Sequence, residues 1–377
     1  MADILRILDR YKISDKVIVY TVKKDKNTIL QVNDIYKDLQ GNRFCIKAIE
    51  KIHNIIDKKD TDESSTGLML EAFNEIEVRG NILIKNMQKI NFLFCNHPLY
   101  PRQVDEDYRE EYQAAKNKYS CALFSYEDLQ MGKLSLYGEE ISGLTIYRGW
   151  MMKPELYRNF YKMLNEKEIV LINSPEEYER YHMFSGWYED FKDETPESVW
   201  ESGESVNDIL NLTHNLMGSY IVKDYVKSRK HEWYDACFIE NISNKENLSR
   251  VITNFINRQG SDLAGGIVLR KFEKLKQIGF HEKSGMPISE EYRIFVFAGR
   301  VLIVDDYWRE NKNVSFSDEE WNWIDKIVGR IKSNFVTIDL ARKEDGNLII
   351  MELGDGQVSG IQQIKPEYFY EAFNSTK

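Results

Sequence analysis

The sequence predicts a protein of mixed α and β structure, in which an open α/β layer is followed by a domain of hairpins and helices. Short apolar runs alternate with helical patterns between residues 89 and 183, which is typical of a mostly parallel sheet. Near the end of the chain, two β-favouring runs flank Asp345-Gly346. This dipeptide supplies the positive φ of a tight hairpin turn. The 377 residues are enough for two or three domains.

The composition is that of an ordinary globular protein, with 42% hydrophobic residues, 30% charged residues and 7 prolines. The 51 basic and 61 acidic residues give a net charge of −10, which argues against a protein dedicated to binding nucleic acid or an anionic membrane. We therefore expect neither partner. No apolar run approaches the roughly 18 residues of a membrane span, and the N-terminus lacks the apolar core of a signal peptide.

The four cysteines are scattered through the chain, and none of them has the spacing of a metal-ligand pair. This usage predicts reduced thiols in a cytoplasmic protein. The cysteines are Cys45, Cys95, Cys121 and Cys237.

Residues 1–88 have a character of their own. A short strand pattern lies within 15–24, and helical spacing of apolar positions occurs over 33–58 and 65–77. The polar run between these two segments predicts a solvated loop. No motif here indicates catalysis, so we interpret the region as an accessory module that could recognise a protein partner.

Residues 89–200 predict the α/β layer. Ligands of such sheets bind beyond the carboxyl ends of the strands, and Arg148 follows one predicted strand. Its guanidinium could hold a carboxylate or phosphate of a substrate. The alternative is a surface arginine beside a packed tryptophan. Thr195-Pro196 is typical of a helix start, leading into the last domain from residue 201. The expected strands are 89–95, 122–124, 144–147 and 169–172, and the expected helical segments are 105–118, 127–132, 154–166 and 175–183.

A basic segment opens the last domain. Residues 219–230 predict a strand that runs into a basic loop, and alternation places Lys223, Tyr225 and Lys227 on one face. Either an anionic ligand lies between the lysines, or the lysines protect an exposed edge strand. The pattern alone slightly favours the edge strand.

The hairpin near the end of the chain places two carboxylates together. If Asp345 and Gly346 are the two turn residues, Asp339 lies opposite Glu352. Directly opposed like charges are destabilising, so a cation between them is one explanation, and oxygen ligands suit Mg²⁺. Asp355 could add a third oxygen. The alternative is a register shifted by one residue, with one carboxylate in solvent.

From residue 219 onward the predicted order is strand, helix, strand, hairpin, helix, hairpin. This order, with a lysine on an early strand and a carboxylate pair on the last hairpin, resembles the ATP-grasp superfamily over residues 90–377. More narrowly, five short motifs are similar to those of its bacterial and phage amidoligase-like clade. They are Tyr147-Arg148-Gly149-Trp150-Met151, the segment VKDYVKS from Val222, Val268-Leu269-Arg270, Glu291-Tyr292-Arg293 and the segment ELGDGQ from Glu352.

The resemblance implies an ATP-grasp fold of two α+β subdomains at 201–377, preceded by a small open α/β domain at 89–200 and the accessory module at 1–88. It also implies ATP and Mg²⁺ as cofactors. Two departures are an aspartate, Asp355, near the position where many relatives have asparagine, and the absence of a glycine-rich phosphate loop. The implied roles are the α- and β-phosphates for Lys223 with Lys227 or Lys230, adenine for Arg270, Lys271 and Phe272, ribose for Glu273, the γ-phosphate and developing acyl phosphate for Arg293 and Arg309, and Mg²⁺ for Asp339 and Glu352.

The activity implied by the resemblance is ligation of a carboxylate to an amine through an acyl phosphate. The carboxylate and amine could belong to small molecules or to peptide termini. One alternative is an ATP-binding assembly chaperone that holds a protein through residues 1–88 without ligase turnover. Another is a phosphotransferase that stops at a phosphorylated product. A ligase needs an amine for steady turnover, which separates it from both alternatives.

Overall fold

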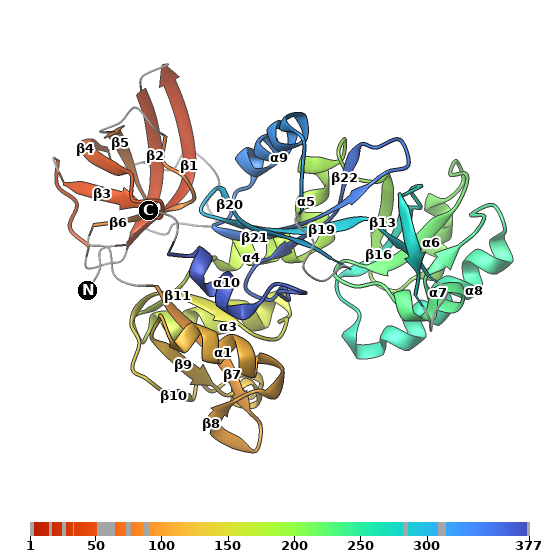
Figure 1. The fold of residues 1–377 in the computed structure, drawn as a ribbon, viewed down its shortest axis with the longest axis horizontal. Coiled ribbons are helices and arrows are strands. Elements are labelled where there is room, and N and C mark those ends of the chain that lie inside the picture. Colours follow the sequence, from red (N-terminus) through yellow and green to blue (C-terminus); the bar gives the residue numbers. More distant parts are fainter. Residues whose placement is uncertain are drawn as a thin grey trace.

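The computed structural model describes residues 4–14, 17–24, 28–32, 34–50, 65–72, 77–85, 90–281, 286–307 and 314–374. Figure 1 shows a β-barrel at the N-terminal end, an α/β layer beneath it, and two further sheets with their helices to the right. Among the described residues, no helix is long and apolar enough to cross a membrane.

The N-terminal region is a closed barrel with the strand order β1-β2-β5-β4-β3-β6. Its interior is filled by aromatic and aliphatic side chains such as Tyr20, Tyr36 and Leu68. The helices expected over 33–58 and 65–77 are therefore wrong wherever those residues are described. Their apolar positions satisfy pairing between distant strands, which overrides the local pattern. The strands are β1 Ile4–Ser14, β2 Val17–Lys24, β3 Ile35–Asp38, β4 Arg43–Glu50, β5 Ser65–Ala72 and β6 Ile82–Ile84.

The middle region confirms the predicted open and mostly parallel layer. The sheet order is β10-β9-β7-β11-β12, and β7 pairs in parallel with both β9 and β11. The strands are β7 Asn91–His97, β8 Tyr100–Val104, β9 Cys121–Phe124, β10 Leu136–Gly138, β11 Gly143–Arg148 and β12 Ile169–Leu171. The helices are α1 Arg109–Lys116, α2 Tyr126–Gln130, α3 Pro154–Asn165 and α4 Pro175–His182.

The third sheet has the order β13-β16-β14-β15. Ser198 begins β13, which pairs with β16, so the helix start expected at Thr195-Pro196 is wrong. The edge-strand interpretation of the basic segment is also wrong, because β14 lies between β16 and β15. The strands are β13 Ser198–Ser202, β14 Tyr220–Asp224, β15 Phe238–Ile239 and β16 Gly266–Lys271, with helices α6 Val206–Leu212, α7 Trp233–Ala236 and α8 Lys245–Gln259.

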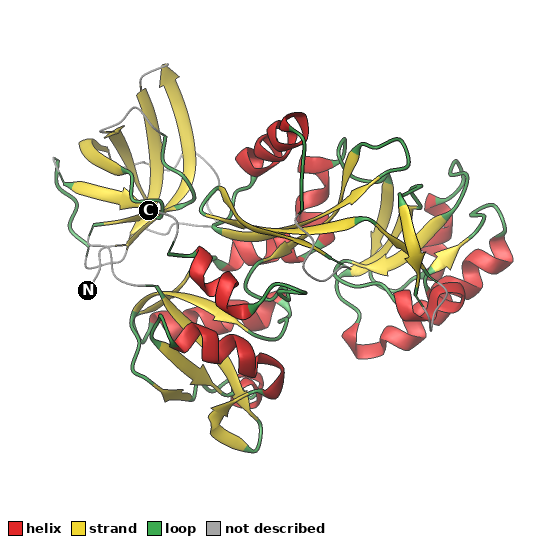
Figure 2. Ribbon diagram, viewed as in Figure 1, coloured by secondary structure: helices red, strands yellow, loops and turns green. Residues whose placement is uncertain are grey.

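The fourth sheet, β20-β19-β21-β22, lies at the centre of the molecule and has helices on both faces (Figure 2). Ile294 and Ile338 face the core that includes α9 and α5, whereas Phe295 and Phe335 face α10. The strands are β19 Glu291–Phe297, β20 Arg300–Asp306, β21 Phe335–Arg342 and β22 Leu348–Asp355, with helices α5 Phe184–Phe191, α9 Asp318–Arg330 and α10 Pro366–Ala372. A separate hairpin joins β17 Gln277–Phe280 to β18 Pro287–Ser289.

The C-terminal helix α10 leaves this sheet and packs on the α/β layer. The ring of Tyr370 meets the ring of Phe92 in β7 edge to face, at 4.9 Å between centroids. The phenol of Tyr370 also donates a hydrogen bond to Glu111 in α1, at 2.8 Å. The helix therefore completes the core of a domain that begins far earlier in the chain.

Candidate active site

The hairpin of β21 and β22 places Asp339 directly opposite Glu352, as predicted. The turn differs from the expectation, because Lys343 donates a backbone hydrogen bond to Asn347 and leaves a three-residue loop at 344–346. Taken alone, that loop would shift the register by one residue. A bulge at Met351, between the pairs Asp339–Glu352 and Leu340–Ile350, restores it.

A row of charged residues crosses this sheet. Arg293 on β19 lies opposite Asp305 on β20 and opposite Asp339 on β21, which in turn lies opposite Glu352 on β22. Arg293 binds Asp339 through two hydrogen bonds, Nε to Oδ1 at 2.7 Å and Nη2 to Oδ2 at 2.6 Å. The nearby carboxylates raise the pKa of Arg293 even though burial alone would lower it. The row therefore holds a paired arginine beside two carboxylates.

The third sheet contributes cations to the same place. Lys223 on β14 is buried, and its ammonium lies 3.2 Å from Oε1 of Glu352. Arg270 on β16 donates from Nη1 to the carbonyl of Met351 at 2.6 Å. Burial lowers the pKa of Lys223, although Glu352 opposes that shift. Two strands of one sheet thus reach across to the bulge and the carboxylate of the other.

Glu352 is the centre of this cluster. Burial raises its pKa, but Lys223, Arg270 and Lys230 together outweigh that effect, so the net pKa lies below the ordinary value. Lys230 is half-buried, and the carboxylate of Glu291 raises its pKa against the effect of burial. At neutral pH the cluster therefore combines an ionised carboxylate with several cations.

One polar atom in this cluster has no partner. The Nε of Arg270 is buried and makes no hydrogen bond, although a buried donor without an acceptor costs about 1–3 kcal/mol. An anion lying between the sheets would satisfy it. Lys223 and Lys230 are placed to neutralise the same anion, and a polyphosphate fits this set of donors.

The carboxylate pair also fits a divalent cation that is shared with phosphates. Mg²⁺ in such sites is commonly bound through one or two carboxylates, with substrate phosphates and water completing its shell. Asp339 and Glu352 can supply these oxygens. The described residues contain no group of three acidic or other ligating side chains, so Asp355 does not join the pair.

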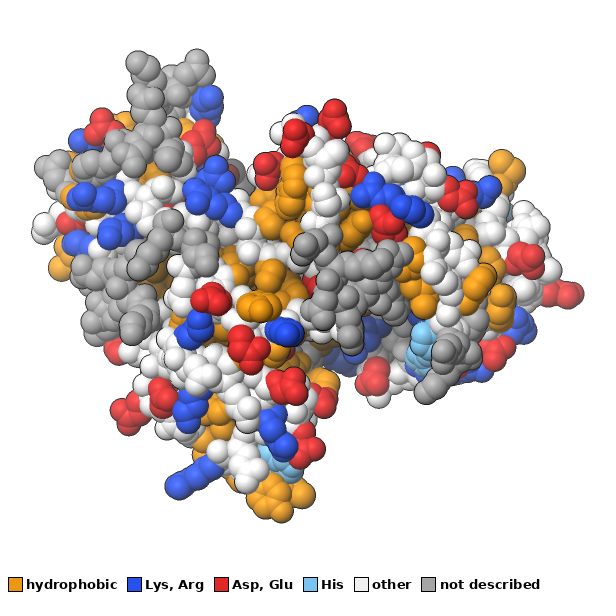
Figure 3. Space-filling view, in the orientation of Figure 1, with side chains coloured by type: hydrophobic (Ala, Val, Ile, Leu, Met, Phe, Trp, Pro, Cys, Tyr) orange, Lys and Arg blue, Asp and Glu red, His pale blue; other side chains and the backbone are white. Residues whose placement is uncertain are grey.

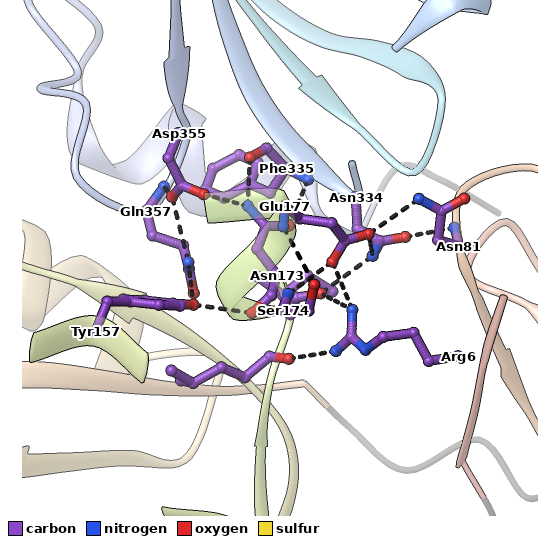
Figure 4. Close-up of polar contacts among 12 residues, drawn as sticks. Arg6, Asn81, Tyr157, Asn173, Ser174, Glu177, Asn334, Phe335, Asp355 and Gln357 are labelled. Atoms are coloured by element: carbon purple, nitrogen blue, oxygen red, sulfur yellow. Dashed lines mark hydrogen bonds and ion pairs between the residues drawn. The ribbon is translucent and has the colours of Figure 1, made fainter. Parts of the chain in front are cut away.

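Asp355 is a buried interdomain residue (Figure 4). It accepts hydrogen bonds from Nδ2 of Asn173 at 2.6 Å and from the backbone N–H of Gln357 at 2.9 Å. These bonds join the end of β22 to the α/β layer. The expectation of a third metal ligand is therefore corrected to a structural role.

The Asp355 carboxyl makes stability depend on pH. Burial raises its pKa from 3.8 to about 7, although hydrogen bonds from Asn173 and Gln357 oppose that shift. Since the folded-state pKa lies above the unfolded value, the ionised carboxyl opposes folding, and its contribution is lost as pH rises from about 4 to about 7. We expect the unfolding free energy to fall by about 2 kcal/mol more in wild type than in Asp355→Asn between pH 5 and pH 8.

Urea unfolding at both pH values measures this difference. Asp325→Asn, which changes an exposed carboxylate on α9, is the matched control and should follow wild type. Parallel pH profiles for wild type and Asp355→Asn would show that the Asp355 carboxyl titrates normally.

Arg148 is likewise a structural residue rather than a substrate-binding one. Its Nε and Nη2 bind the two oxygens of Glu111, each at 3.0 Å. Its Nη1 donates to the carbonyl oxygens of Gly356, Gln357 and Ser359. The guanidinium is 1% exposed and its donors are all used, so the predicted contact with a substrate anion is wrong.

The predicted adenine and ribose residues lie at the end of β16. The amides of Lys271 and Phe272 donate to backbone oxygens of neighbouring segments, and Lys271 is exposed. Phe272 packs against Trp233 and Phe238. Glu273 is half-buried directly after them. The nucleotide contacts of these residues stay predictions.

Two other basic residues do not join the cluster. Lys227 is exposed because β14 ends at Asp224, whose Oδ1 accepts the amide of Lys227 in a turn, so the alternation that placed Lys227 beside Lys223 stops there. Arg309 lies outside the described residues.

Three residues near the site were missed by the sequence argument. His182, at the end of α4, feels the charges of Glu352 and Lys223, and burial lowers its pKa to about 4. Glu291 and Asp305 lie beside Lys230 and Arg293. Glu291 carried a usable signal, because it lies two residues before Arg293 on the same face of a strand.

Residues 211–373 match the model of a protein family described as an ATP-grasp domain, the third family of its clade. No curated protein matches the chain. Among solved structures, the chain is similar to the D-cycloserine synthetase DcsG, with 12% identity, a TM-score of 0.48, and 77% of this chain and 100% of that one covered.

Two further similar structures have comparable values. For the ATP-grasp ligase PsnB in complex with a minimal precursor, Mg and ADP, identity is 11%, the TM-score is 0.47, and 76% of this chain and 97% of that one are covered. For D-alanyl-alanine synthetase A from Vibrio cholerae, the values are 11%, 0.48, 77% and 99%. These TM-scores are too low to carry an argument about what the chain does. The family match does identify the domain: residues 211–373 form an ATP-grasp domain of that clade.

Proposed function

We propose that the protein is an ATP- and Mg²⁺-dependent ligase that joins a carboxylate to an amine. The observation that carries this proposal is the meeting of Asp339 and Glu352 with Lys223, Lys230 and Arg270 between two facing sheets of an ATP-grasp domain. Carboxylates and cations so arranged suit a metal-bound polyphosphate better than either group alone would.

Each group has a distinct part in this proposal. Lys223, Lys230 and the free Nε of Arg270 would bind phosphate oxygens of ATP. Asp339 and Glu352 would hold Mg²⁺, which supplies charge neutralisation and orientation of the phosphates. Arg293, paired with Asp339, would stabilise negative charge that develops at the transferred phosphoryl group.

The proposed reaction has two steps. A carboxylate oxygen of the substrate attacks the γ-phosphorus of ATP, and ADP leaves, giving an acyl phosphate. The amine nitrogen then attacks the acyl carbon, inorganic phosphate leaves, and the amine proton is released. The protein forms no covalent bond in either step, so its contribution is positioning and charge stabilisation.

The cysteines are consistent with this mechanism. All four are free and buried, and burial raises the pKa of Cys95 and Cys121 to about 12 and that of Cys237 to about 11. These three thiols are protonated at neutral pH and make poor nucleophiles. Free buried thiols also suit a reducing compartment, and we place the protein in the cytoplasm on that ground.

Calorimetric titration of ATP with and without Mg²⁺ tests the metal site. In wild type, Mg²⁺ should strengthen binding roughly tenfold or more, and in Glu352→Gln this gain should be lost, because one of two charged ligands becomes neutral. Glu344→Gln, in the exposed loop of the same hairpin, should behave as wild type. A Mg²⁺ gain that survives in Glu352→Gln would exclude the carboxylate pair as the metal site.

A turnover assay tests the reaction class. Phosphate release should require ATP, a carboxylate and an amine together, and pools of amino acids and short peptides provide both. With an ¹⁸O-labelled carboxylate, one ¹⁸O should appear in the released phosphate, as the acyl phosphate demands. A stable phosphorylated product without an amine would indicate a phosphotransferase. ATP binding without turnover in any pool would favour an assembly role.

A further inference from the structure

A groove separate from the nucleotide site lies between the barrel and the α/β layer. Its volume is about 950 Å³, near the upper end of the roughly 300–1,000 Å³ that small-ligand pockets occupy. One wall is formed by β1 and β2 of the barrel, and the other by α3 and the beginning of α4. It therefore has room for a short stretch of polypeptide.

The groove is strongly basic. Eight of its twenty lining residues are lysine or arginine, and three are aspartate or glutamate. The whole chain has a net charge of −10, and acidic and basic side chains are interspersed over the face shown in Figure 3. A local excess of positive charge on an acidic protein indicates an anionic ligand.

The floor of the groove fixes its two walls together (Figure 4). Arg6 on β1 donates to Oε2 of Glu177 in α4 at 2.6 Å and to the carbonyl oxygens at the end of β12. Asn81, just before β6, donates to Oε1 of Glu177 at 2.9 Å, and its own amide donates to Oδ1 of Asn334 at 2.6 Å. These buried bonds join the barrel, the layer and the ATP-grasp domain, so the groove is preformed.

The donors left for a ligand are side chains rather than backbone amides. At the beginning of α4, the amide of Ser174 donates to Glu177 and the amide of Glu177 donates to Ser174, so this capping box already uses donors that a phosphate would need. In contrast, the exposed ammonium groups of Lys162 and Lys332 form no ion pair with any described carboxylate. Point charges that are spread over two walls suit carboxylates spaced along a chain.

The remaining lining is partly apolar and partly exchangeable. Leu8 is 52% exposed on the barrel wall, and Val170 and Tyr161 lie on the other wall. Arg158 pairs with Glu176 and Glu179, but these pairs are half-exposed or more, and such pairs contribute about 0–1 kcal/mol. A ligand carboxylate could therefore displace them at little cost.

From these observations we infer that the groove is a docking site for an acidic polypeptide segment of a partner protein, one in which carboxylates alternate with apolar side chains. The carboxylates bind the lysines and arginines of both walls, and the apolar side chains cover Leu8 and Val170. This site adds to the proposed ligase activity and does not depend on it.

Fluorescence anisotropy with the full chain tests the site. The probe is a labelled twelve-residue peptide of alternating glutamate and leucine, and the control probe has glutamine in place of glutamate. Only the acidic peptide should bind, and Lys162→Glu/Lys332→Glu should weaken it roughly tenfold or more, since two attractive charges become repulsive. Lys326→Glu/Lys365→Glu, two exposed lysines outside the groove, is the matched control and should bind as wild type.

Other outcomes would overturn the inference. Equal binding of the glutamine peptide would show that charge plays no part, and unchanged binding by Lys162→Glu/Lys332→Glu would place the peptide elsewhere. Binding of inorganic triphosphate or a single-stranded oligonucleotide without binding of the acidic peptide would identify a phosphate site. Thermal melting of each variant separates lost binding from lost folding, and ATP titration should be unchanged in all of them.

Discussion

Replacing Lys223 with methionine is expected to weaken ATP binding about 100-fold while leaving the fold intact. The ammonium of Lys223 is buried and lies 3.2 Å from Glu352, so it is positioned to bind a phosphate oxygen once Glu352 engages a metal. Methionine fills a similar volume and removes a buried charge, which seldom destabilises a protein. Calorimetric titration of ATP in the presence of Mg²⁺ measures the loss.

Lys326→Met is the matched control, because Lys326 is an exposed lysine on α9. It should bind ATP as tightly as wild type does. If Lys223→Met binds ATP as wild type does and has the same melting temperature, the cluster around Glu352 is a structural ion network, and the nucleotide site must be sought elsewhere.

Replacing Arg148 with methionine should have the largest effect on stability, a loss of about 3–5 kcal/mol. The variant leaves Glu111 buried with only the phenol of Tyr370 as a partner, and it frees the carbonyl oxygens that Arg148 binds after β22. Urea unfolding at neutral pH measures the change.

The double variant Arg148→Met/Glu111→Met separates the ion pair from the carbonyl contacts. It should recover part of the loss, because no unpaired charge stays buried. Wild-type stability in Arg148→Met, together with lost activity, would return Arg148 to the role of a substrate-binding residue.

Local signals explain why the α/β layer could be predicted and the barrel could not. Strands β7, β9, β11 and β12 are short apolar runs bounded by polar residues, and helices separate most of them along the chain. The barrel depends on the closing pairs β1–β6 and β3–β6, which join residues far apart in sequence. Its apolar positions, such as Leu68 and Leu70, were compatible with helical spacing until those pairings were known.

The candidate site shows the same division. Asp339 and Glu352 could be paired from the sequence, but the counting assumed a two-residue turn, and the bulge at Met351 compensated for the longer loop. Asp355 and Arg148 were misassigned because a motif records residue type and spacing but not burial. Their partners, such as Asn173 and Glu111, come from other segments of the chain.

The position of α10 bears on the order in which the protein can fold during synthesis. Tyr370 and its partner Glu111 are 259 positions apart, and ribosomes add about 5–20 residues per second. The α/β layer therefore emerges tens of seconds before the helix that covers Phe92 and Phe94. During that interval its exposed aromatic surface invites non-native contacts, so the nascent layer should be a natural client of holdase chaperones.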